Sequence, residues 1–269
     1  MTEHPRKRET NVLVDPASRP VIAHRGASAH APENTMEAFA KALEAGADAI
    51  ELDVRVTRDG AVVVIHDPDV DRTTSRRGMV AAMSLAELRS LDAGAGFTRD
   101  EGRTYPFRER GVRIATLDDV LGAFPHTPLL VEIKEARAAA VAVAIVRRHG
   151  AENRVVLASE LDEAMRLVRP QALLTGASRP DAMRLLRRAC LGLAPGALPY
   201  QVLSIPWRVG LLRVPMSRMC RIARRAQVPT HAWTVNARNV AVRLWRAGVS
   251  GIVTDDPAEM LRARSDLEK

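Results

Sequence analysis

The stretch AGADAIELDVRVTRDGAVVVIH, residues 45–66, decides the fold. Gly46 is a typical residue to end a helix, and residues 49–56 then alternate apolar with charged side chains, as a strand does. Asp59-Gly60 is a turn signal, and the apolar run 62–65 follows it. Because so short a turn forces antiparallel pairing, this stretch predicts a helix end followed by a β-hairpin.

Outside this hairpin, short apolar runs alternate with segments of helical periodicity. Strands are expected over residues 21–24, 49–56, 62–65, 129–133, 155–158, 172–174, 202–205, 230–235 and 251–254. Helices are expected over residues 34–45, 84–91, 136–149, 161–169, 180–191, 216–226, 237–247 and 257–264. Strands that alternate with helices of this length indicate a parallel sheet.

The length of the chain, 269 residues, is enough for a closed α/β barrel, which needs roughly 250 residues. The ninth strand candidate is assigned to the hairpin, and eight then remain for the barrel. We therefore predict a single (β/α)8 TIM barrel over residues 20–265. Residues 1–19 are expected to be a flexible lead-in, and a small insertion is expected at about 68–113, where the alternation breaks.

The composition excludes several classes of protein. Two cysteines, Cys190 and Cys220, cannot form a disulfide scaffold or a four-cysteine zinc site. No apolar run reaches the length of about 18 residues that a membrane-spanning helix needs. The N-terminus also lacks the apolar core of a signal peptide. These features predict a cytoplasmic protein.

The net charge is +8, and only four of the 40 basic residues are lysines. Arginine suits bidentate contact with phosphate. Because the basic residues are scattered and aromatic residues make up only 3% of the chain, nucleic-acid binding is not expected.

Residues 189–207 are uncharged and rich in proline, and the apolar segment 209–214 follows them. One interpretation of residues 189–214 is an apolar lip, flanked by arginines, that contacts a lysophospholipid or an anionic membrane surface. The other interpretation is a core strand near 202–205 with its loops.

The hairpin also concentrates carboxylates. If Asp59-Gly60 is a two-residue turn, His66 lies directly opposite Asp53, and Glu51 shares the face of Asp53. Buried carboxylates that lie side by side need a cation or a proton, and oxygen ligands favour Mg²⁺ or Ca²⁺. The alternative is an exposed strand face with ordinary charges.

Further polar residues stand at other strand ends. His24-Arg25 ends the first strand and suits a phosphate-facing loop with a proton shuttle, although a lone histidine is also common in cores. Glu132 and Lys134 share one face of a later strand. Trp233 fits either a site or the core.

One internal repeat in the sequence supports a fold built from repeated helix–strand units. Residues 45–53, with the pattern AG-x3-I-x2-D, recur as residues 247–255. In both copies glycine ends a helix and aspartate stands near the exit of the next strand, the end at which barrels place their chemistry.

Together these blocks closely resemble glycerophosphodiester phosphodiesterases, in order, from about residue 21 to residue 258. The matching blocks are His24-Arg25-Gly26, Pro32-Glu33-Asn34-Thr35, Glu51-Leu52-Asp53-Val54, Asp59-Gly60, His66-Asp67, Arg72-Thr73-Thr74, Glu132-Ile133-Lys134, Trp233-Thr234-Val235-Asn236 and Gly251-Ile252-Val253-Thr254-Asp255. Glu160 departs from the pattern, because an aromatic residue often follows the serine there, and this leaves the leaving group open.

The resemblance implies a (β/α)8 barrel with a small insertion. It also implies one divalent cation, Mg²⁺ or Ca²⁺, held by three carboxylates: Glu51, Asp53 and Glu132.

The resemblance implies hydrolysis of glycerophosphodiesters to sn-glycerol 3-phosphate and an alcohol, with His24 and His66 as the acid–base pair. Arg25 and Lys134 would contact the phosphate, and Trp233 would line the glycerol side. The implied partner is this small substrate, with no protein partner. Two alternatives stay open: a lysophospholipase D-type activity on lysophospholipids, and a phosphodiester-binding protein without catalysis.

Overall fold

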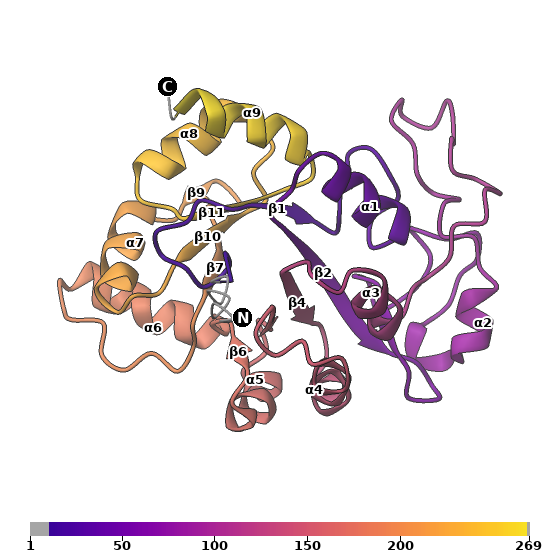
Figure 1. Ribbon diagram of the computed structural model, residues 1–269, viewed down its shortest axis with the longest axis horizontal. Coiled ribbons are helices and arrows are strands. Elements are labelled where there is room, and N and C mark those ends of the chain that lie inside the picture. Colours follow the sequence, from indigo (N-terminus) through magenta and orange to yellow (C-terminus); the bar gives the residue numbers. More distant parts are fainter. Residues whose placement is uncertain (1–10, 268–269) are drawn as a thin grey trace, which may run out of the picture.

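The structure is a computed structural model that describes residues 11–267, and it is an α/β barrel (Figure 1). Eight strands run parallel in the order β6-β5-β4-β2-β1-β11-β10-β7. Their bounds are β1 (Val21–His24), β2 (Ala49–Val56), β4 (Leu129–Ile133), β5 (Val155–Ala158), β6 (Leu174–Thr175), β7 (Leu203–Pro206), β10 (Thr230–Trp233) and β11 (Gly251–Thr254). The sheet ends meet at a parallel bridge between Gly176 and Val202. The predicted barrel is confirmed.

Helices cover the outside of the barrel (Figure 1). They are α1 (Met36–Glu44), α3 (Leu117–Ala123), α4 (Ala139–Arg148), α5 (Asp162–Val168), α6 (Arg179–Cys190), α7 (Met216–Arg225), α8 (Arg238–Arg246) and α9 (Pro257–Leu267), with 3-10 turns at Ala136–Ala138 and Arg169–Gln171. Helix α3 was not predicted; its signal in the sequence is the capping box of Thr116 and Asp119. Within the described residues, none of the helices has the length and apolarity needed to cross a lipid bilayer.

The hairpin is present, but its predicted register was wrong by one residue. Strand β3 (Val62–Val64) pairs with β2 so that Val54 lies opposite Val64, and the Ile65 amide donates to the Asp53 carbonyl. The turn has three residues rather than two, since Thr57 still pairs with Ala61. A two-residue type I′ turn needs positive φ at both central positions, and here only Gly60 has it (φ +85°).

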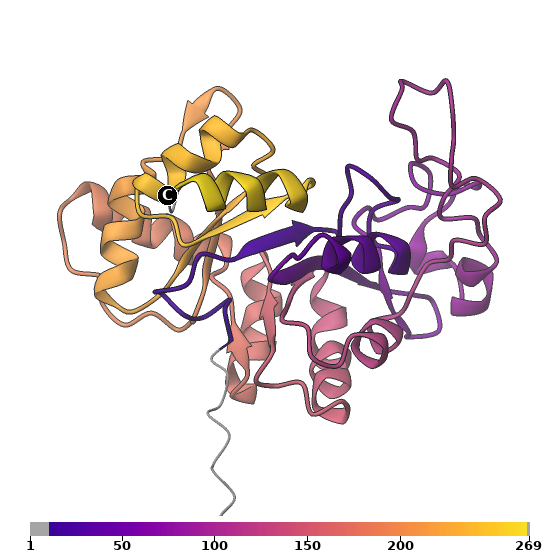
Figure 2. The same ribbon diagram turned by 45° about the horizontal axis from the view of Figure 1, so that its top comes forward.

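The segment from residue 65 to 116 connects β3 to α3 and lies where the insertion is expected. It holds one 3-10 turn (Val80–Ala82) and helix α2 (Leu85–Arg89). It has a small core of its own, built from Val70, Leu88 and neighbouring apolar side chains. In both views it lies on the opposite side of the molecule from α6 and α7 (Figures 1 and 2).

Residues 11–19 differ from the flexible lead-in that was expected. Leu13 is fully buried and packs with Ile22, Leu130 and Val253 inside the barrel. The Asn11 side chain donates to the Asn153 carbonyl (3.1 Å). These residues are part of the core, and residues 1–10 of the expected lead-in lie outside the described residues.

A histidine without a hydrogen-bond partner lies inside the barrel wall. His231 on β10 is 0% exposed, and neither ring nitrogen has a partner in the described part of the chain. Burial lowers the pKa of His231 to about 4. The folded protein therefore keeps this imidazole neutral well below the pH at which an unfolded chain would protonate it.

The buried His231 predicts that the folded protein loses stability in acid. Since the pKa of His231 falls from 6.5 to about 4 on folding, the unfolded state binds the extra proton as the pH drops from about 7 to 4. Between pH 7 and 4 this proton uptake should lower the free energy of unfolding of the unmodified protein by about 3 kcal/mol, at about 1.4 kcal/mol per pH unit. His231→Gln should not show this part of the decrease. Urea unfolding of both proteins across this range measures it. An equal loss in both proteins would contradict a neutral, buried imidazole.

Candidate active site

A cavity of about 420 Å³ opens at the carboxyl ends of the barrel strands. Seven of the eight predicted site residues line it, namely His24, Arg25, Glu51, His66, Glu132, Lys134 and Trp233. The eighth, Asp53, is 1% exposed and contacts Arg25 and Lys134 directly. The barrel therefore brings together all the residues that the sequence analysis singled out.

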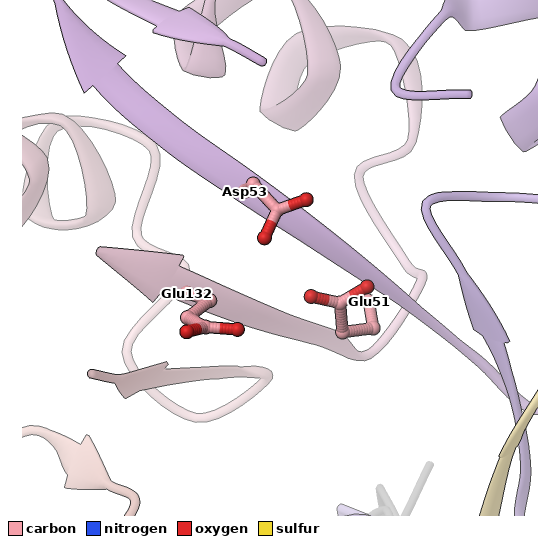
Figure 3. Close-up of side chains that lie close together, drawn as sticks. All are labelled: Glu51, Asp53 and Glu132. Carbon is pink, nitrogen blue, oxygen red and sulfur yellow. The ribbon is translucent and has the colours of Figure 1, made fainter. Parts of the chain in front are cut away.

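Three carboxylates form the floor of this site (Figure 3). Glu51 and Asp53 share one face of β2, and Glu132 lies on β4 opposite Asp53 in the register. One oxygen from each of the three lies within 4.8 Å of the others. Burial, reinforced by the charges of Asp53 and Glu132, raises the pKa of Glu51 to about 8. This crowded set of hard oxygen donors fits a divalent cation.

Two cations and an amide hold Asp53 in its charged form. Lys134 Nζ lies 2.9 Å from Asp53 Oδ1, and Arg25 Nε lies 3.1 Å from Asp53 Oδ2. The Asn34 amide also donates to Oδ2 (2.9 Å). Burial alone would raise the pKa of Asp53, but the charges of Lys134 and Arg25 outweigh it and lower the pKa. Asn34 had no predicted role in the site, although it belongs to a motif block; it was expected to cap the helix that follows, but the N-cap is Thr35.

A backbone turn after β1 places Arg25. Its φ is +56°, in the left-handed region, and its amide donates to Glu51 Oε2 (3.0 Å). Gly26 follows at φ +83°, where an added Cβ would lie 2.6 Å from the Ala38 backbone. Glycine is therefore required at position 26, and the turn it permits points one cation and one amide at the carboxylates.

His24 is oriented by a carboxylate distant in the sequence. Its Nδ1 lies 2.7 Å from Asp255 Oδ1, and Asp255 also accepts hydrogen bonds from Ser28 Oγ (2.9 Å) and Asn236 Nδ2 (2.5 Å). Burial alone would lower the pKa of His24, but the hydrogen bond to Asp255 and the charge of Glu51 raise it. Asp255 was missed as a site residue, although the internal repeat had placed an aspartate at this strand exit.

His66 is oriented in the same way from the other side. Its Nδ1 lies 2.7 Å from Asp67 Oδ1, and Arg72 Nε donates to Asp67 Oδ2 (2.7 Å). Arg72 also donates twice to Glu33, at 2.6 and 2.8 Å, and Glu33 in turn accepts from Arg25 Nη1 (2.8 Å). This chain of ion pairs connects the segment after the hairpin to the carboxylate floor. Glu33, Asp67 and Arg72 stand in the motif blocks, but no role had been assigned to them.

The wall of the cavity is less charged. Trp233 on β10 and Ser204 on β7 face the cavity from one side, and Glu160 and Leu161 after β5 face it from the other. Glu160 is exposed. The cavity thus has a charged floor, two histidines and a less charged wall.

Comparisons with known proteins agree with this geometry. Residues 24–259 match the model of the glycerophosphoryl diester phosphodiesterase family. A glycerophosphodiester phosphodiesterase of Caldanaerobacter subterraneus is 34% identical over 252 residues, which are 90% of this chain and 96% of that protein.

Solved structures show the same architecture. A glycerophosphodiester phosphodiesterase from Agrobacterium tumefaciens has a TM-score of 0.71 at 27% identity, and the match covers 91% of this chain and 99% of that one. A phosphodiesterase of Oleispira antarctica, solved with the product sn-glycerol-3-phosphate, has a TM-score of 0.74 at 26% identity, with 91% and 96% covered.

The carboxylate floor predicts pH-dependent cation binding. We expect Mg²⁺ or Ca²⁺ to bind more tightly as the pH rises toward 8, because the cation must displace the proton that the raised pKa of Glu51 retains. Calorimetry in buffers of different ionisation enthalpy should show proton release on binding. Glu51→Gln should weaken binding by at least about tenfold, since one charged ligand is lost.

Glu44→Gln is the matched control, because Glu44 is an exposed glutamate at the end of α1. If both variants bind the cation as the unmodified protein does, Glu51 is not one of its ligands, and the three-carboxylate site is wrong as predicted.

Proposed function

This chain belongs to the glycerophosphoryl diester phosphodiesterase family, and we propose that it hydrolyses glycerophosphodiesters to sn-glycerol 3-phosphate and an alcohol, with His24 and His66 as the acid–base pair. The observation that carries the proposal is the pair of carboxylate-held histidines at one cavity above three carboxylates. Two histidines beside an anion site are what a phosphodiester needs: one base for the nucleophile and one acid for the leaving alcohol.

Arg25 and Lys134 are proposed to contact the phosphate oxygens. Both cations line the cavity and are already paired with the carboxylates of the floor. Fixed positive charges that face the phosphoryl group stabilise the negative charge that builds up in the transition state. A divalent cation held by Glu51, Asp53 and Glu132 would supply further charge neutralisation there.

His24 and His66 are each held by a neighbouring carboxylate. In each one a carboxylate holds Nδ1, which fixes the ring and leaves Nε2 for the reaction. One histidine deprotonates the nucleophile, either water or the glycerol 2-hydroxyl, and the other protonates the leaving oxygen. Attack by the 2-hydroxyl gives a cyclic phosphate, which water then opens. The hydrogen bond to Asp255 and the charge of Glu51 raise the pKa of His24 above its ordinary value.

Trp233 is proposed to line the glycerol side of the cavity, since its ring offers an apolar face for the carbon chain. The exposed carboxylate of Glu160 then borders the side of the leaving alcohol. We retain a cytoplasmic location as part of the proposal, because Cys190 and Cys220 are both free thiols.

A lysophospholipid is the second candidate substrate. Within residues 189–214, β7 is a core strand, whereas residues 208–213 form an exposed apolar hairpin next to β7. The core-strand interpretation therefore holds for residues 203–206, whereas the contacting lip stays a prediction for residues 208–213. An exposed apolar segment beside the cavity wall would suit an acyl chain.

The substrate prediction is metal-dependent release of sn-glycerol 3-phosphate from glycerophosphocholine or glycerophosphoethanolamine, abolished by EDTA. An enzyme-coupled assay for the product, with Mg²⁺ and Ca²⁺ supplied separately, measures it. Turnover of a lysophospholipid alone would favour the second candidate. A folded, cation-loaded protein that turns over none of these substrates would contradict the proposed function.

The catalytic prediction concerns the histidines. His24→Ala and His66→Ala should each lower kcat by about 10²- to 10⁴-fold, because each removes one proton-transfer group. His126→Ala, a change at an exposed loop histidine, is the control and should leave kcat unchanged. Near-normal turnover in either site variant would remove that histidine from the mechanism.

A further inference from the structure

The charge of this chain is strongly asymmetric along the sequence. Between Asp181 and Asp255 there is no Asp or Glu, while twelve arginines and no lysine lie in that stretch. Residues 182–254 therefore carry a formal charge of +12, which leaves −4 for the rest of the chain. The net charge of +8 conceals this difference between the two parts of the chain. The basic residues were expected to be scattered, but residues 182–254 carry an excess of them.

The most exposed apolar side chains lie within this basic stretch. Strands β8 (Arg208–Val209) and β9 (Leu212–Arg213) form a short antiparallel hairpin. Leu211 at its turn is 101% exposed, Leu212 is 78% exposed and Val209 is 63% exposed. Figure 2 shows this hairpin in orange at the upper edge of the molecule. Isolated apolar side chains are common on surfaces, but three on one small projecting hairpin are not.

The hairpin has two different faces. Val209 pairs with Leu212, and Arg208 pairs with Arg213, so successive pairs put apolar and basic side chains on opposite faces. Among residues 11–267, no carboxylate forms an ion pair with Arg208 or Arg213. Arg208 lies over the Trp207 ring, 5.0 Å from its centroid. The tip therefore combines positive charges that no described carboxylate neutralises with exposed apolar side chains.

The hairpin is anchored beside the catalytic cavity. Trp207 at its base donates from Nε1 to the Thr234 carbonyl (3.1 Å), and its amide donates to the Trp233 carbonyl (3.3 Å). Trp233 and Thr234 both line the cavity. A surface bound at the hairpin tip would thus lie close to the cavity wall.

We propose that the β8–β9 hairpin docks this enzyme on the surface of an anionic lipid bilayer. Leu211 and Leu212 enter the interfacial region, and Arg208 and Arg213 contact lipid phosphates. The helix that follows adds to the attraction, since Arg218, Arg221 and Arg225 on α7 are exposed and no described carboxylate forms an ion pair with them.

The chemistry of the substrate fits this location. A glycerophosphodiester is the polar part of a phospholipid after hydrolysis of its acyl esters, so a deacylation reaction at a membrane surface must supply it. Docking is separate from catalysis, because the hairpin tip lies outside the cavity-lining residues. Binding to vesicles can therefore be measured whatever the turnover.

The test is co-sedimentation of the full chain with vesicles of phosphatidylcholine, with and without phosphatidylglycerol. We expect binding to the anionic vesicles only, and weaker binding at high salt. Leu211→Ser combined with Leu212→Ser should lower the partition coefficient by at least about tenfold, because the apolar contact is lost. Arg208→Gln combined with Arg213→Gln should lower it by roughly 25-fold, at about fivefold for each arginine.

Matched control variants test whether any loss of vesicle binding is specific to the hairpin. Leu167→Ser removes a leucine on α5 that is 50% exposed, and the pair Arg103→Gln with Arg110→Gln removes the same charge from the insertion. Both controls should bind anionic vesicles at least half as well as the unmodified chain. Thermal unfolding midpoints of the Leu211 and Leu212 variant should be unchanged, because these side chains are exposed in the fold.

Three results would overturn the proposal. The first is no binding to anionic vesicles, and the second is equal binding to neutral and anionic vesicles. The third is a self-association that the Leu211 and Leu212 variant abolishes in sedimentation velocity, which would make the tip a contact between two copies of this chain.

Discussion

The rest of the site depends on three carboxylates held together at the floor of the barrel. Glu51, Asp53 and Glu132 come from two neighbouring strands, and their oxygens lie within 4.8 Å of one another. Burying such charges costs far more than an ordinary contact returns, so positive charge must accompany them. Lys134 and Arg25 provide part of it, and the strained turn at residues 25–26 exists to bring Arg25 to Asp53.

Around this floor, the ion pairs that orient the two histidines come from opposite directions. Asp255, at the end of the last strand, holds His24, whereas Asp67 and Arg72, after the hairpin, hold His66. Glu33 connects Arg72 to Arg25, so the segment after the hairpin is joined electrostatically to the first strand. An imidazole held at one nitrogen has a defined position for the other, and acid–base catalysis needs that position.

The two sides of the molecule have different surfaces. The insertion is on one side, and the acid-free, arginine-rich wall with its apolar hairpin is on the other (Figures 1 and 2). The cavity is lined mostly by residues outside the basic stretch, together with Ser204, Trp233, Thr234 and Val253 from within it. Residues 24–72 and 132–134 supply the charged side chains of the site, while Trp233 and the hairpin base at Trp207 belong to the basic wall.

The sequence by itself determined the barrel and the candidate residues of its site. Apolar period, helix stops and strand-end residues are local, so the strands could be predicted without coordinates, and the resemblance of the motif blocks to a known family named the eight candidate site residues. The tertiary structure alone decided the register of the hairpin, the burial of Leu13 and the pairing of His24 with Asp255. Asp255 is 231 residues from His24 along the chain. Only closure of the parallel sheet, which places β11 beside β1, brings the two together, and no local pattern encodes that contact.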